Sequence, residues 1–127
     1  MSYTMEQRDT EFHMDQANLE AARKALRQAM EGFKWFNPKK AHSLDDAVAQ
    51  CDWALEFDDN DNVIGIEMLT GYQGEEKRMF DAIAPYVKAG SYIQMSGEDG
   101  SIWRWVFDGF SCKELEPVIA WPEGGAK

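Results

Sequence analysis

Residues 53–68 read WALEFDDNDNVIGIEM and decide the fold class. Every second residue on either side of the Asp/Asn cluster at 58–62 is apolar: Trp53, Leu55, Phe57, Ile64, Ile66 and Met68. A period of two is that of a strand with one buried face, and Asp and Asn are strong turn formers. The stretch therefore predicts a β-hairpin.

Upstream of the hairpin, the apolar spacing is helical. The apolar residues of 15–35 recur at intervals of three and four, which predicts one amphipathic helix that a following Asn-Pro pair ends. Ser43 can cap a second, shorter helix that runs to Gln50. Residues 1–14 are polar and show no clear period, so we expect a flexible tail there.

Downstream of the hairpin, the sequence predicts one more helix and then strands. The helix covers 75–88 and should kink or restart near Ala84, because Pro85 removes a backbone donor. Three strands are predicted after it, at 91–96, 102–108 and 114–121. Residues 124–127 are expected to be a short tail.

Together these elements predict an α+β fold in a single domain, residues 15–123. The order α-α-β-β-α-β-β-β groups the strands consecutively, which favours antiparallel pairing. We therefore expect a mostly antiparallel five-stranded sheet with the helices packed on one face. A chain of 127 residues, 44% of them hydrophobic, can bury one core of this size.

The chain is strongly acidic, and its charge is unevenly distributed. It has 23 Asp and Glu against 13 Lys and Arg, a net charge of −10, and residues 43–76 contain ten of the acids and no Lys or Arg. Such a block repels phosphate and attracts cationic surfaces, so we expect a basic protein partner and no direct nucleic-acid binding. With neither a membrane-length apolar run nor a signal-peptide pattern, we expect a cytoplasmic protein with no membrane partner.

Few residues indicate catalysis or metal binding. Cys51, Cys112 and the two histidines lack the clustered spacing of a zinc site. The turn after residue 57 matches a calcium-binding EF-hand loop only in part, because Val63 and Leu69 stand where glycine and glutamate are required. No nucleophile elbow, phosphate loop or dinucleotide fingerprint occurs. We therefore predict no catalytic residues, no metal and no cofactor, and expect that the protein is not an enzyme.

The stretch GEDGSIWRWVF at 97–107 places two tryptophans on one face of a strand and Arg104 on the other. In one interpretation the tryptophans form the floor of the core, and Arg104 pairs with Glu56 or Glu67 across the sheet. In the other, a cleft binds a sugar or a metabolite through six residues: Tyr92, Glu98, Asp99, Trp103, Arg104 and Trp105. Both interpretations stay open at the level of sequence.

The segment from Trp53 to Trp121 resembles a group of small acidic bacterial proteins, some of them borne on plasmids or phages, that has no established activity. The matching pieces are the strand at 53–57 with the Asp/Asn turn after it, FDAIAPYV at 80–87, GSYI at 90–93 and GEDG leading into WRW at 97–105. The resemblance implies an α+β sheet fold and a bacterial or mobile-element origin, and it carries over no catalytic residue. It covers a little over half of the chain and leaves the first helix outside.

The leading functional hypothesis is a protein-binding module of inhibitor or immunity type, whose carboxylates cover a basic partner surface. The residues expected to bind the partner belong to the acidic block: Asp45, Asp46, Glu56, Asp58, Asp59, Asp61 and Glu67. The main alternative is the small-ligand cleft, and a DNA-mimicking inhibitor and an enzyme are further ones. The block can also be a solvated surface without a partner. The sequence does not indicate the oligomeric state.

Overall fold

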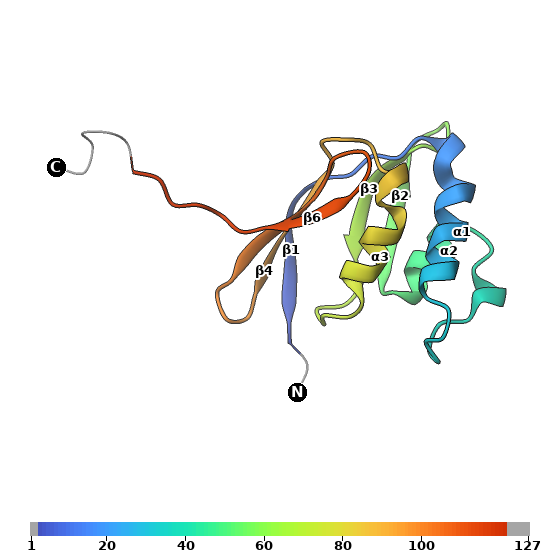
Figure 1. Ribbon diagram of the computed structural model, residues 1–127, viewed down its shortest axis with the longest axis horizontal. Helices are drawn as coiled ribbons and strands as arrows, with labels where there is room; N and C mark the ends of the chain where they lie inside the picture. Colours follow the sequence, from blue (N-terminus) through green and yellow to red (C-terminus); the bar gives the residue numbers. More distant parts are fainter. Residues whose placement is uncertain (1–2, 122–127) are drawn as a thin grey trace.

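The computed structural model describes residues 3–121 and has two antiparallel β-sheets and three α-helices (Figure 1). The four-stranded sheet has the order β1-β4-β5-β6, formed by Met5–Glu11, Tyr92–Gly97, Ile102–Phe107 and Cys112–Leu115. The two-stranded sheet is the hairpin of β2 (Trp53–Phe57) and β3 (Val63–Met68). The helices are α1 (Leu19–Ala29), α2 (Leu44–Gln50) and α3 (Glu76–Ile83), and the 3₁₀ turns are η1 (Gln16–Asn18), η2 (Pro38–Lys40) and η3 (Ala84–Tyr86).

The α+β class with antiparallel strands is confirmed, but the single five-stranded sheet is wrong. The sequence analysis placed β1 in a tail, but this strand lies between β4 and β3. It forms a ladder with β4 and none with β3, so the β2–β3 hairpin is a sheet of its own. Strand β1 pairs with β4 along its length, and its flanks bond to the β3 side through Met5 N to Gly71 O (2.7 Å) and Met14 N to Val63 O (3.1 Å). Only Met5 is buried among the seven residues of β1, so its sequence carries little apolar signal.

The predicted helices are confirmed in type; α2 begins after Ser43 and ends at Gln50 as predicted, whereas the other two are shorter than predicted. Ser43 Oγ accepts a hydrogen bond from Asp46 N (3.0 Å) at the start of α2. The helix predicted over 75–88 divides into α3 and η3 at Pro85, as a residue without an amide hydrogen requires. The helix predicted over 15–35 is too long, because α1 ends at Ala29 and Gly32 then adopts a left-handed φ of +99°. None of the helices in residues 3–121 has the length and apolar content to cross a bilayer.

The C-terminal part also departs from the expected pattern. The strand predicted over 114–121 is β6, which begins at Cys112 and ends at Leu115. Residues 116–121 continue as an arm that leaves the body of the domain, shown in red in Figure 1. The tail predicted at 124–127 lies outside the described residues.

An aromatic cluster forms the centre of the core, between α3 and the two sheets. The ring centroids of Trp53, Phe80 and Trp105 lie 5.3 Å (Trp53–Phe80), 6.2 Å (Trp53–Trp105) and 5.0 Å (Phe80–Trp105) apart. Trp105 is 4% exposed and Trp103 is 8% exposed, so both belong to the core, as the first interpretation of their stretch expects. Trp53 Nε1 donates to the buried carboxylate of Glu76 (3.2 Å).

Candidate functional site

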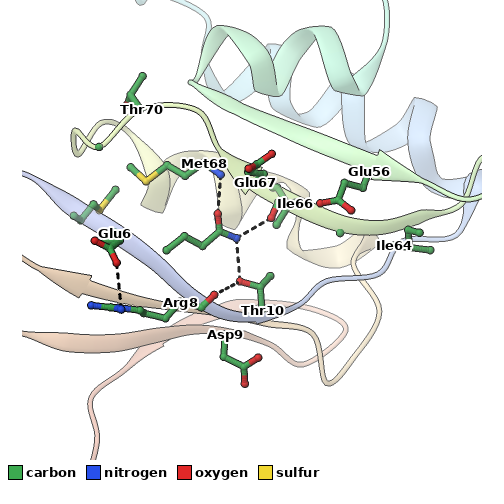
Figure 2. A pocket seen from close by; sticks show the side chains of 14 residues that line it. Glu6, Arg8, Asp9, Thr10, Glu56, Ile64, Ile66, Glu67, Met68 and Thr70 are labelled. Carbon is green, nitrogen blue, oxygen red and sulfur yellow. Dashed lines mark hydrogen bonds and ion pairs between the residues drawn. The ribbon is translucent and has the colours of Figure 1, made fainter.

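A groove of about 770 Å³ lies where β1 and β3 run side by side without forming a continuous sheet (Figure 2). Residues 5–10 of β1 and 64–68 of β3 form its walls. In the described part of the chain its lining carries four carboxylates and one cation: Glu6, Asp9, Glu56, Glu67 and Arg8. We call this feature the acidic groove.

A bulge in β1 explains why the two sheets separate here. The pairing of β1 with β4 shifts between Gln7 and Thr10, so Arg8 and Asp9 together oppose the single residue Gln94. A bulge bends its strand and increases the local twist. The middle of β1 therefore turns away from β3, while the flanks of the strand stay hydrogen-bonded to that side.

The side chain of Gln7 bridges the acidic groove. Its Oε1 accepts a hydrogen bond from Met68 N (2.7 Å), and its Nε2 donates to Ile66 O (2.8 Å) and to Thr10 Oγ1 (3.0 Å), the dashed lines that meet between the strands in Figure 2. The side-chain amide thus offers β3 one donor and one acceptor, as the peptide group of a neighbouring strand does. A side chain replaces the backbone ladder at this point.

Two of the four carboxylates in the acidic groove are already engaged. Glu6 Oε1 lies 3.2 Å from Arg8 Nη1, and Arg8 Nε donates to Ser96 Oγ (3.0 Å) on β4. Asp9 Oδ2 accepts a hydrogen bond from the Tyr92 hydroxyl (2.7 Å), and its side chain points away from β3 in Figure 2. These two carboxylates are therefore partly compensated by β1 and β4.

Glu56 and Glu67 are the uncompensated pair of the acidic groove. Glu67 lies opposite Ala54 and Glu56 lies opposite Gly65, so the two carboxylates are diagonal neighbours on one face of the hairpin, roughly 7–8 Å apart at Cα. The Glu56 carboxyl group lies over Gly65, where a Cβ atom would come within 3.1 Å of Glu56 Cδ. Neither carboxylate has an ion pair or a side-chain hydrogen bond within residues 3–121.

The acidic groove presents carboxylate acceptors of the kind that cations contact. Carboxylates without partners accept strong, charge-assisted hydrogen bonds from ammonium and guanidinium groups. Burial raises the pKa of both Cys51 and Cys112 to about 12, so the two thiols are protonated at neutral pH and are poor nucleophiles. Among the residues that the structure describes, no three His, Cys, Asp or Glu side chains converge as metal ligands.

The structure places the seven residues of the predicted partner site in three locations. Glu56 and Glu67 line the acidic groove. The tip of the β2–β3 hairpin carries Asp58, Asp59 and Asp61, and the first turn of α2 carries Asp45 and Asp46. The predicted set is therefore spread over three elements, with its strand residues in the acidic groove and Asp58 at the edge of a second groove.

Several of the remaining acids stabilise the fold locally. Asp58 accepts backbone hydrogen bonds from Asn62 and Asn60 (2.9 Å each), which lower the pKa of its carboxyl group. Asp45 Oδ1 accepts from Leu55 N (3.0 Å) and so occupies a backbone donor of β2. These carboxylates hold the hairpin turn and the sheet edge.

The structure brings Arg104 together with Tyr92 but does not bring all six residues of the predicted small-ligand cleft to one place. Trp103 and Trp105 lie on the core face of β5, whereas Arg104 lies on the outer face. Arg104 stacks 4.3 Å from the centroid of the Tyr92 ring and donates to Gln94 Oε1 (2.9 Å), so its predicted pairing with Glu56 or Glu67 is wrong. Glu98 and Asp99 instead anchor the N-terminal segment, through bonds from Thr4 N (2.7 Å) and the Tyr3 hydroxyl (2.6 Å).

Sequence analysis missed the β1 half of the acidic groove. Glu6, Gln7, Arg8 and Asp9 all lie in the stretch assigned to a tail. The available signal was the apolar pair Met5 and Phe12 at the two ends of the stretch, but the bulge between them breaks the alternation of a strand. Comparison with protein-family models, curated proteins and solved structures gave no match for this chain.

Proposed function

We propose that the protein is a binding module of inhibitor or immunity type, whose acidic groove accepts a Lys- or Arg-rich segment of a partner protein. The observation that carries the proposal is the pair Glu56 and Glu67, two uncompensated carboxylates on one face of the hairpin that line a groove of about 770 Å³. A basic side chain in the groove would meet carboxylates of β2 and β3, beside the Glu6–Arg8 ion pair of β1.

The electrostatics favour a partner with several cations. An exposed ion pair contributes only about 0.2–1 kcal/mol, so one Lys on one Glu gives weak binding. A net charge of −10 raises the association rate with any cationic surface. The acidic groove then fixes where on the protein the cationic segment binds. A short basic segment that contacts both glutamates and the edge of the groove satisfies both requirements.

The acidic groove is a better docking site than the hairpin tip, although both are acidic. Asp58 at the tip already accepts hydrogen bonds from the turn, so part of its charge is used locally. The acidic groove has four carboxylates and one cation in its lining, whereas the second groove, which Asp58 borders at the tip, has two carboxylates and Lys88. The acidic groove therefore concentrates charge where a side chain can be surrounded.

A cationic probe peptide tests the proposal. A labelled decalysine peptide should bind the wild-type protein, and binding measured by fluorescence anisotropy should weaken steeply between 50 and 300 mM NaCl. Because two ion pairs are worth about 0.4–2 kcal/mol, the double substitution Glu56→Gln/Glu67→Gln should raise the dissociation constant by roughly 2- to 30-fold.

The matched control removes the same number of charges from the hairpin tip. In Asp59→Asn/Asp61→Asn, asparagine also tolerates the left-handed φ of +63° at residue 61. The dissociation constant of this control for the peptide should stay within about twofold of the wild-type value. If both double variants weaken binding equally, the peptide responds to net charge alone and the groove has no special role.

A further inference from the structure

The C-terminal arm is the most exposed apolar segment of the described chain. Val118, Ile119 and Trp121 are 90%, 82% and 79% exposed, and the arm projects away from both sheets in Figure 1. Large apolar side chains gathered in this way on a soluble surface mark an interaction site. Within residues 3–121, therefore, nothing covers the apolar side chains of the arm.

A second uncovered apolar surface lies on the outer face of β4, β5 and β6. The strand register places Tyr92 beside Val106, and Arg104 beside Leu115, on the face opposite to Trp103 and Trp105. Ile102 and Leu115 are 47% and 50% exposed there. We call this surface the outer face; its members are Tyr92, Ile102, Arg104, Val106, Lys113 and Leu115.

The arm does not reach the outer face of its own chain by continuing in its direction. Leu115 lies opposite Arg104, so the two residues after it reach the level of Ile102, where β5 begins. The apolar residues 118–121 therefore lie beyond the end of the strand. Six extended residues span roughly 20 Å, which is enough to cross to a second molecule.

We propose that two copies of the chain exchange their arms, each arm packing on the outer face of the other copy. The interface is reciprocal and closes with two-fold symmetry, so it produces a dimer and no longer assembly. Trp121 is placed to stack on Arg104, whose guanidinium already lies over Tyr92. The outer face adjoins the acidic groove where the Tyr92 hydroxyl donates to Asp9, but neither Trp121 nor Ile102 lines the groove.

Area and charge both support a second copy as the occupant. The exposed apolar side chains of one arm and one outer face, at roughly 100–200 Å² each, sum to the order of 800 Å² per copy, the size of a standard stable interface. Arg104 and Lys113 lie on the outer face, and Glu116 lies at the base of the arm. The local charges are thus complementary despite the net charge of −10.

Sedimentation velocity of the full chain tests the dimer. At tens of micromolar the wild-type protein should sediment at twice the chain mass of 14.5 kDa, in both 50 and 500 mM NaCl, because the contact is apolar. Trp121→Ala and Ile102→Lys should each raise the dimer dissociation constant at least tenfold.

Ile64→Lys is the control, since Ile64 is also 47% exposed but lies on β3. A monomeric wild type, or a dimer that Ile102→Lys and Ile64→Lys weaken equally, would overturn the proposal.

A mixing experiment distinguishes arm exchange from arms that pack on each other. The Trp121→Ala chain keeps an intact outer face, and the Ile102→Lys chain keeps an intact arm, so the mixed pair retains one of the two contacts. The heterodimer should form at lower concentration than either variant homodimer. If the mixture associates no better than the separate variants, exchange is refuted. Decalysine binding by Trp121→Ala should equal wild type, which separates failure of the dimer from failure of the groove.

Discussion

Replacing Gln7 with methionine tests whether one side chain joins the two sheets. Methionine keeps the length and the unbranched shape of glutamine but offers neither the donor nor the strong acceptor. The backbone groups Met68 N and Ile66 O both lose their partner. Each lost hydrogen bond costs about 1 kcal/mol where water can partly replace it, as at this half-buried site. We expect Gln7→Met to lower the free energy of unfolding by about 2 kcal/mol, close to 30-fold in the unfolding equilibrium.

Urea unfolding measures the global effect, and amide hydrogen exchange measures the local one. The Met68 amide, which donates to Gln7 Oε1, should exchange faster in Gln7→Met than in wild type. Gln94→Met is the control, because Gln94 forms an exposed side-chain bond to Arg104; it should change the free energy of unfolding by less than about 0.5 kcal/mol. If Gln7→Met is as stable as this control and its Met68 amide exchanges at the wild-type rate, the bridging role is refuted.

Two further predictions concern the core. Burial raises the pKa of Glu76 above its ordinary value of 4.5, so the folded state binds a proton more tightly, and the free energy of unfolding should fall as the pH rises from 4.5 through the raised value. The bond from Trp53 opposes this shift; Trp53→Phe should therefore raise the Glu76 pKa further in carbon-detected NMR titration, and an unchanged or lower value would contradict the assignment. In urea unfolding, Phe80→Ala should lower the free energy of unfolding by about 3–5 kcal/mol. Phe110→Ala, at an 83% exposed position, should lower it by less than about 0.5 kcal/mol. Similar losses in the two variants would contradict the assignment of Phe80 to the core.

Elements with strong local signals were predictable from the sequence. The β2–β3 hairpin follows from alternation around an Asp/Asn turn, and α2 follows from Ser43 as its cap. Pro85 likewise fixes the boundary between α3 and η3. In each case the deciding chemistry lies within a few residues of the element, so no knowledge of tertiary neighbours is needed.

The acidic groove was predictable only on its hairpin side. Glu56 and Glu67 follow from the cation-free block together with the period of two. The β1 side depends on contacts far apart in the chain: Gln7 bonds a residue 59 positions away, and Arg8 bonds one 88 positions away. A polar strand is recognised by its neighbours and not by its own composition, and the bulge removes the remaining periodic signal.

The central position of β1 also has a consequence for the order of assembly during synthesis. Its residues leave the ribosome well before those of its β4 partner, residues 92–97, which follow more than 80 positions later. In a nascent chain that ends before β4, Glu56 and Glu67 are already present, but β1 has no partner strand. The β1 wall of the acidic groove is therefore not yet in place. The acidic groove therefore forms only once β4 has been synthesised, and fragments that end before β4 should not acquire it gradually.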